Sequence, residues 1–278
     1  MMKSIKILLR HLELTLGISL VSLIVLGTLF SGFLFPAGAD DMDLNAMLLP
    51  PFVEWAHPLG TDQLGQDILA RVIIGGKQSL MVGFYSVIGA SVIGILVGLI
   101  AGYYRGVVDM FVMRFADVQL ALPFILLAIT FAAILGSSLQ NMILLMIISQ
   151  WVQYARLVRS SVLSLREREF IQAAKAIGVN DFKIIFRHIL PNLMAPVIVL
   201  MTLNIANNIL LESSLTYVGV GGDPLVPSWG GMLSEGRTYI QEEWWLSVFP
   251  GLAILFTVLG LNLIGDWLRD KFDPTGRQ

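Results

Sequence analysis

Charged residues divide this chain into long uncharged runs, and these runs predict membrane-spanning helices. A helix rises about 1.5 Å per residue, so roughly 20 residues cross a hydrocarbon core about 30 Å thick. Four runs have the length of a single crossing, namely Leu14–Phe35, Ser79–Tyr104, Ile189–Leu211 and Trp244–Gly265. A fifth run, Val118–Ala155, has 38 residues and is too long for one crossing.

The long run contains a polar break that predicts a hairpin. Its middle reads GSSLQN from Gly136 to Asn141, and clusters of Gly, Ser and Asn form turns. One span on each side of this break brings the predicted total to six transmembrane helices. The composition agrees, because only 14% of the residues are charged, against about 25% in soluble domains. We therefore expect an all-α membrane protein.

The basic residues predict the orientation of these spans. If the N-terminus is cytoplasmic, only three of the 18 Lys and Arg residues fall outside, namely Arg71, Lys77 and Arg237. Because Lys and Arg favour the cytoplasmic side, both termini are predicted to be cytoplasmic. The first run is interpreted as an uncleaved span, since the apolar region of a signal peptide has only about 7–15 residues.

The predicted organisation places one span ahead of a core of five. The segments are a cytoplasmic N-terminus (1–13), the first span (14–35), an external loop (36–78), the core (75–266) and a cytoplasmic tail (267–278). The core includes a cytoplasmic loop (157–188) and an external loop (213–243). This second external loop is rich in Gly and Pro, and it either docks a soluble partner or covers the bundle.

Part of the first external loop has helical spacing. Leu64, Ile68 and Val72 are four residues apart, which predicts an amphipathic helix lying on the outer membrane surface. Thr61 or Asp62 is placed to cap its start.

Small residues recur every four positions in the second span, at Ala90, Gly94, Gly98 and Gly102. This spacing lets two helix backbones approach closely. The stripe is either a contact with another subunit or ordinary packing within the chain.

Polar residues share one face of the fifth span. Asn204, Asn207 and Asn208 have the i, i+3, i+4 spacing of a helix face, and Glu212 follows at the outer end. Amides in hydrocarbon are costly unless they meet protein or water. This face is predicted to line a pathway, and the alternative is that its amides hold the bundle together by interhelical hydrogen bonds.

The charged segment 166–192 lies between two spans and is predicted to form two short helices. Phe170, Ala173, Ala174 and Ile177 form an apolar stripe on the first helix, which Gly178 ends. Asn180 or Asp181 then caps the second. The small alanines allow another protein to come close.

The sequence Gln172-Ala173-Ala174, with Gly178 and Leu190-Pro191, resembles the EAA loop of ABC importer inner-membrane subunits. The resemblance implies a coupling helix that fits a cleft on an ATP-binding subunit. The coupling residues it implies are Arg166, Glu167, Glu169, Gln172, Ala173, Ala174 and Gly178. Gln172 departs from the Glu of the motif, and His188 departs from an Ile.

Other motifs resemble the second permease subunit of dipeptide, oligopeptide and nickel importers. They are HPLGTD at 57–62, LTYVGVG at 215–221, PSWG at 227–230 and GDWLRD at 265–270, while Gln66 replaces an arginine common in that group. The resemblance implies a type I importer permease fold in the bacterial inner membrane. It also implies a homologous permease, one or two ATP-binding subunits and an external binding protein as partners. The cargo would be a peptide, nickel, glutathione or a metal chelate.

Catalytic and metal-binding patterns are not evident in the sequence. Gly76-Lys77 lacks the flanking residues of a phosphate loop, so ATP and Mg are expected on partner subunits, and no enzyme activity or cofactor is expected on this chain. The three histidines fall in separate segments, and His57 with Asp67 is interpreted as loop capping rather than a metal site. The near-neutral net charge gives no basis for nucleic-acid binding.

An ion-gradient-driven secondary transporter is the alternative function. Such proteins carry inverted repeats and ionisable residues at the midplane of the membrane, and neither feature is evident here. A membrane-embedded enzyme is a third class, and its convergent nucleophiles or acids are not evident in the spans.

Overall fold

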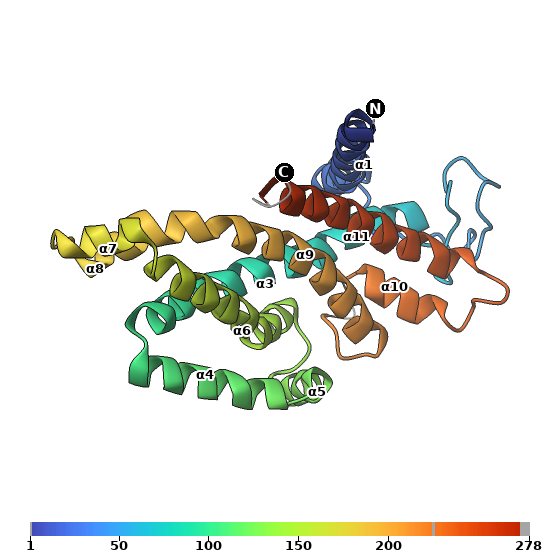
Figure 1. The fold of residues 1–278 in the computed structure, drawn as a ribbon. Coiled ribbons are helices and arrows are strands. Elements are labelled where there is room, and N and C mark those ends of the chain that lie inside the picture. Colours follow the sequence, from blue (N-terminus) through green and yellow to red (C-terminus); the bar gives the residue numbers. More distant parts are fainter. Residues whose placement is uncertain (1, 224–225, 273–278) are drawn as a thin grey trace.

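The computed structural model describes residues 2–223 and 226–272, and this part of the chain is helical with no β-strand. In chain order the elements are α1 (Met2–Leu29), α2 (Ser31–Leu34), α3 (Ile68–Tyr104), α4 (Gly106–Ala121), α5 (Phe124–Leu135), α6 (Leu139–Arg166), α7 (Glu169–Ala176), α8 (Asp181–Lys183), the π-helix η1 (Ile184–Ile189), α9 (Leu190–Tyr217), α10 (Trp229–Gly236) and α11 (Trp245–Phe272). Figure 1 shows the long helices packed side by side in a tilted bundle.

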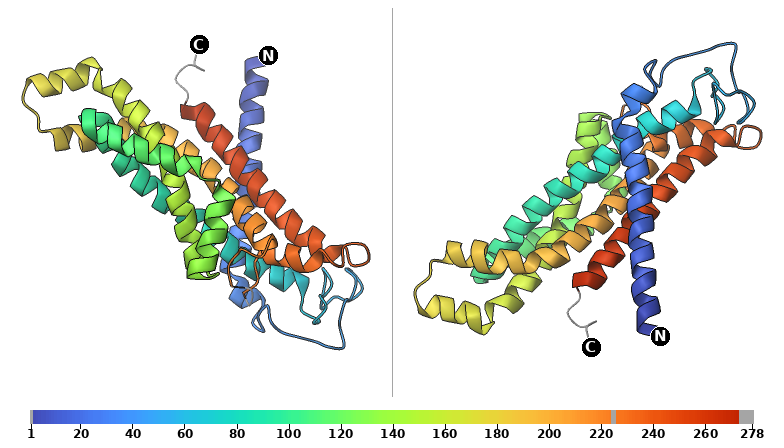
Figure 2. Two further views of the ribbon diagram at one scale, coloured as in Figure 1. Left: turned by 90° about the horizontal axis from the view of Figure 1, so that it is seen from below. Right: turned by 90° about the horizontal axis from the view of Figure 1, so that it is seen from above.

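The helix ends and connections divide between the two ends of the bundle. Figure 2 shows the start of α1, the end of α11 and the α7–α8 segment toward one end, which we call the basic end. The loop between α2 and α3, the α5–α6 turn and the α9–α11 connection lie at the other end, which we call the outer end. This arrangement agrees with the predicted alternation of the spans. The end of the predicted tail, 273–278, lies outside the described residues.

Four described helices are long and apolar enough to span a membrane, or five if α4 and α5 form one bent span. α4 and α5 meet at an angle of 85°, so the third predicted span, which begins at Val118, includes a sharp bend. The bend lies at Leu122–Pro123, because proline disfavours the helical conformation of the residue before it and lacks a backbone N–H. The predicted hairpin is present, and the Ser138 side chain caps α6 by accepting from the Asn141 backbone N–H.

The separate surface helix predicted near residues 64–73 is wrong. α3 runs without interruption for 37 residues from Ile68 to Tyr104. The predicted cap is also wrong, because Asp67 caps the helix by accepting from the Ala70 N–H at 2.7 Å. Asp62 instead closes the preceding turn by accepting from the Leu64 and Gln66 backbone N–H groups.

The small-residue stripe packs within this chain, against α6. A Cβ on Gly94 would lie 2.4 Å from the Tyr154 Cβ and 2.6 Å from the Trp151 carbonyl oxygen. A Cβ on Gly98 would lie 2.6 Å from the Ala155 carbonyl oxygen. α3 and α6 therefore cross with their backbones in near contact, which decides between the two readings of the stripe in favour of intramolecular packing.

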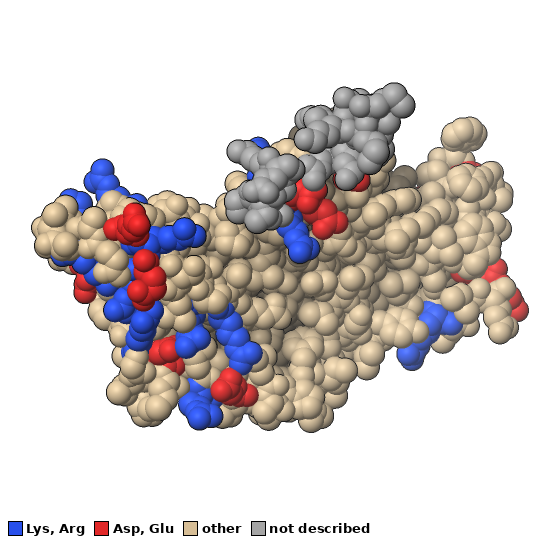
Figure 3. Space-filling view, viewed as in Figure 1, with Lys and Arg blue, Asp and Glu red and all other residues tan. Residues whose placement is uncertain are grey.

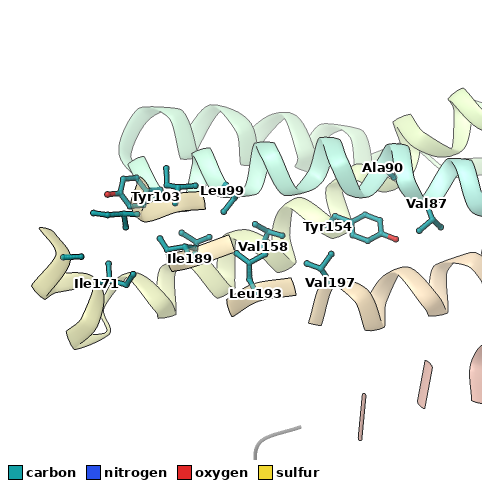
Figure 4. Close-up of a cluster of buried hydrophobic side chains, with 14 residues drawn as sticks. Val87, Ala90, Leu99, Tyr103, Tyr154, Val158, Ile171, Ile189, Leu193 and Val197 are labelled. Atoms are coloured by element: carbon teal, nitrogen blue, oxygen red, sulfur yellow. The ribbon is translucent and has the colours of Figure 1, made fainter. Parts of the chain in front are cut away.

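The largest buried cluster forms where α3, α6, α7, η1 and α9 meet, toward the basic end (Figure 4). Leu99 from α3, Val158 from α6 and Leu193 from α9 face one another in its centre. Ile171 from α7 is fully buried in the same cluster. The short helix α7 is thus attached to the membrane-spanning helices by apolar packing.

The second external loop covers the outer end of the bundle in the part that includes α10. Trp229 is 1% exposed, and its indole N–H donates to the Val72 carbonyl of α3 at 2.8 Å. Arg71 pairs with Asp62 and, at 2.8 Å, with Glu235. These contacts show a packed cover, one of the two roles left open by the sequence. Docking of an external partner on its exposed parts remains a prediction.

Candidate coupling site and polar network

α7 is shorter than the predicted helix. Arg168 has an extended conformation, so α7 begins only at Glu169, and it ends at Ala176. Arg166 and Glu167 therefore do not belong to the coupling helix, because they lie at the C-terminal end of α6. There Glu167 pairs with Arg105 at 2.7 Å.

The predicted apolar stripe of α7 divides between two faces. Ala174 is buried beside Ile171 against the bundle, while Ala173 is exposed and Ile177 is 81% exposed. The expectation that both alanines face a partner is therefore wrong for Ala174. Residues i and i+1 on a helix point about 100° apart, so adjacent alanines cannot serve the same surface equally.

Gly178 ends the helix as predicted, with φ of +79°, a conformation in which glycine is favoured. Asn180 caps α8 by accepting from the Phe182 backbone N–H at 2.9 Å. From Asp181 the chain continues through α8 and η1 into α9 as one 37-residue helical segment. Pro191 lies inside this segment, directly after η1, and it does not break the segment although it lacks a backbone N–H.

An exposed apolar surface forms around α7 and α8. We call it the coupling surface and define it by Phe170, Ala173, Ile177, Phe182 and Phe186. The centroids of the Phe182 and Phe186 rings are 4.4 Å apart, and the two rings line an open groove. On the face shown in Figure 3, Lys and Arg gather over this end of the molecule with acidic residues among them. The exposed apolar residues of this segment thus lie among charged ones.

The predicted pathway residues fall into a hydrogen-bond network between helices. The Asn208 side chain is fully buried, donates to the Ser86 hydroxyl of α3 at 2.6 Å and accepts from Gln150 of α6. Asn204 donates to the Tyr154 hydroxyl of α6 at 3.0 Å. These contacts correct the pathway role for Asn204 and Asn208, because their polar groups join α9 to its neighbours inside the chain.

The other two predicted pathway residues, Glu212 and Asn207, differ in burial. Glu212 is fully buried, and its carboxylate accepts from the hydroxyls of Ser79 at 2.8 Å and Thr216 at 3.1 Å, with a further bond from Ser228. It joins α3, α9 and the start of α10, so the pathway role is corrected for Glu212 as well. Asn207 is exposed on α9 and stays a candidate.

Residues 94–278 match the family described as the binding-protein-dependent transport system inner membrane component. The dipeptide transport system permease protein DppC of Alkalihalophilus pseudofirmus is 45% identical over 93% of this chain and 84% of its own. This chain belongs to that ABC importer permease family.

A second sequence relative agrees with this assignment, and a solved structure shares the fold. The glutathione transport system permease protein GsiD of Pectobacterium atrosepticum is 39% identical over 95% of this chain and 87% of its own. A chain of the inward-facing MetNI methionine ABC transporter matches in fold with a TM-score of 0.58, at 19% identity, over 73% of this permease and 96% of that chain. The resemblance found in the sequence is thereby confirmed.

Membership of the family decides several general properties. The permease is a multi-pass inner-membrane protein. ATP is hydrolysed by a separate subunit, and the permease family has no cofactor. The binding-protein-dependent system also implies an ATPase and a binding protein as partners. Within the described residues no group of three or more His, Cys, Asp or Glu is arranged to hold a metal ion.

Sequence reasoning missed Tyr103, the penultimate residue of α3. Its side chain lies in the buried cluster and is 4% exposed. Lys175 of α7 lies over its ring at 4.9 Å, and partial burial together with the nearby Arg166 lowers the pKa of Lys175. The only signal in the sequence is an aromatic pair at the end of an apolar run, just before the basic Arg105.

Proposed function

We propose that this permease forms one half of the path that carries peptides, or a related small solute such as glutathione, across the inner membrane. A homologous permease would supply the other half, and one or two ATP-binding subunits would drive the transport. The relatives whose names include dipeptide and glutathione transport support this cargo class. The observation that carries the proposal is the exposed Ala173 face of α7, at the basic end of the bundle.

The proposed topology has six spans with both termini in the cytoplasm, as in a type I importer permease. The bent α4–α5 pair would form the third span. α6 would form the fourth, because its 28 residues are long enough to cross although it is more polar than the others. The grouping of the start of α1 and the end of α11 with α7 in Figure 2 supports this arrangement. α7 would then lie in the cytoplasm, where ATP-binding subunits are found.

Uptake into vesicles tests the proposal directly. The complex that co-purifies with the tagged chain would be placed in liposomes with ATP inside, and labelled dialanine and the binding protein outside. We expect uptake that requires ATP and is independent of an imposed proton or sodium gradient. Uptake driven by a gradient without ATP would instead identify the secondary transporter considered above. Labelled glutathione in a parallel assay distinguishes the two cargo classes.

We further propose that Asn207 faces the path between the two permeases. It is exposed on α9 between the buried Asn204 and Asn208, so its amide is available to a neighbouring chain or to solute. Asn207→Leu is expected to lower uptake several-fold without lowering recovery of the complex, because an amide in the path is lost. Asn207→Gln keeps an amide and is the matched control. Equal uptake by the leucine variant and the wild type would remove Asn207 from the path.

A further inference from the structure

Tyr103 connects the spanning helix α3 to the coupling segment through several contacts at once. Its hydroxyl donates to the Asp181 carboxylate at 2.5 Å. Lys175 lies over its ring at 4.9 Å and Arg166 at 5.7 Å. Arg166 also donates to the Tyr103 backbone carbonyl. The end of α6, the last turn of α7 and the start of α8 therefore all contact one residue of α3.

The bond to Asp181 differs from the apolar contacts around it. Ile171 and Ala174 hold α7 against the cluster by packing, which has no strict direction. A hydrogen bond to a carboxylate is directional and stronger than a neutral one. Asp181 itself is exposed, so its bond to Tyr103 fixes the position of α8 relative to the buried end of α3.

α3 extends from Tyr103 to the cover at the outer end. Its 37 residues correspond to about 55 Å of helix. Near its start, a Cβ on Gly75 would lie 3.2 Å from the Pro227 backbone, and Ser79 bonds Glu212. One continuous helix thus joins the Tyr103 end to residues that contact the cover.

We propose that Tyr103 is a positioning residue through which movement of the α7–α8 segment is transmitted to α3. This inference rests on the proposed function, because it takes the force on α7 to come from an ATP-binding subunit. Its hydroxyl, rather than the ring, is the specific part, since the ring also serves packing and the two cations.

Tyr103→Phe removes only the hydroxyl and keeps the buried ring. Tyr104→Phe is the matched control, because Tyr104 is the next residue, is 56% exposed and stacks edge-on against Tyr103 at 5.3 Å. In the intact complex, we expect Tyr103→Phe to lower the transport achieved per ATP hydrolysed by about fivefold, with ATP hydrolysis retained. Tyr104→Phe is expected to keep the wild-type ratio.

A variant of the other residue in this hydrogen bond, Asp181, makes the test independent of how well Tyr103→Phe folds. Asp181→Asn weakens the same bond from an exposed position and is expected to lower the ratio similarly. The double variant is expected to lose little more than either single one, since both changes affect one interaction. An unchanged ratio in Tyr103→Phe or in Asp181→Asn would overturn the proposal, and so would a fully additive double variant.

Hydrogen exchange separates this inference from the proposed function. The amide groups of residues 169–183 are expected to exchange about fivefold faster in Tyr103→Phe than in the wild type or Tyr104→Phe, because the segment loses its directional bond. This measurement needs no transport. Vesicles in which the wild type fails to transport would refute the proposed function, while unchanged exchange would refute the role of Tyr103 by itself.

Discussion

Replacing Ala173 with arginine is expected to abolish substrate-stimulated ATP hydrolysis and ATP-driven uptake, while the permease still folds. Ala173 is exposed on α7, on the face opposite the buried Ile171, so a long side chain there does not disturb the core. If an ATP-binding subunit closes over this face, the new charge is buried without a partner. Such a charge costs on the order of 3 kcal/mol, which corresponds to about a hundredfold in affinity.

The measurement is recovery of the ATPase with the tagged permease, followed by ATP hydrolysis with and without substrate. Ala173→Ser is the control, because serine is small enough to keep the contact. Normal stimulation in Ala173→Arg would show that the ATPase binds elsewhere. Ala174 offers a contrast, since it is buried, and arginine there is expected to destabilise the permease itself.

The coupling segment shows what periodicity can establish and what it cannot. The spacing of apolar residues correctly placed a helix near 169–176 and a glycine end at Gly178. It did not reveal the break at Arg168, because Arg and Glu favour helices and no proline or glycine marks that position. It also did not divide the stripe into buried and exposed faces, since this depends on the neighbouring helices.

The spans were predictable because charge in hydrocarbon is costly enough to clear long runs of the sequence. The bend at Pro123 was not predicted, because the length of an uncharged run gives no information on the angle between its helices. The length of α3 was also underestimated, because the predicted span began only at Ser79. Arg71 and Lys77 interrupt the uncharged run, but Arg and Lys favour helices, so the helix runs through both of them.

The polar residues of α9 illustrate a different limit. Helical spacing correctly placed Asn204 and Asn208 on one face but wrongly included the exposed Asn207, and a face can meet water or protein at the same spacing. Only the positions of Gln150 and Ser86 on two other helices decided the outcome. The interhelical hydrogen bonds were one of the two readings left open, and burial of both amides selects it.

The crossing of α3 and α6 explains why the small-residue stripe is needed for the mechanism proposed here. If α3 carries movement from Tyr103 to the outer cover, it must move with α6 or slide along it without side chains interlocking. Glycines at the crossing leave a smooth contact between backbones. Packing tight enough to exclude a methyl group also makes this crossing sensitive to added volume.

Gly94→Ala is therefore expected to destabilise the permease by about 1–3 kcal/mol, in spite of the higher helix propensity of alanine. The added Cβ would lie 2.4 Å from the Tyr154 Cβ and 2.6 Å from the Trp151 carbonyl oxygen. Neither atom belongs to the flexible end of a side chain, so the two helices must separate. Tyr154 would then be displaced from Asn204, its hydrogen-bond partner.

Gly27→Ala is the matched control, because it is the same change within a membrane helix, α1. A Cβ on Gly27 would meet its nearest atom, on Ile73, at 4.0 Å, which is an ordinary contact. Thermal unfolding of the detergent-solubilised complex is expected to show a lower midpoint for Gly94→Ala and an unchanged or higher one for Gly27→Ala. Equal midpoints for the two variants would mean that α3 and α6 are not in backbone contact. The stripe would then be free to meet another subunit, and α3 would have to transmit movement without α6 as its guide.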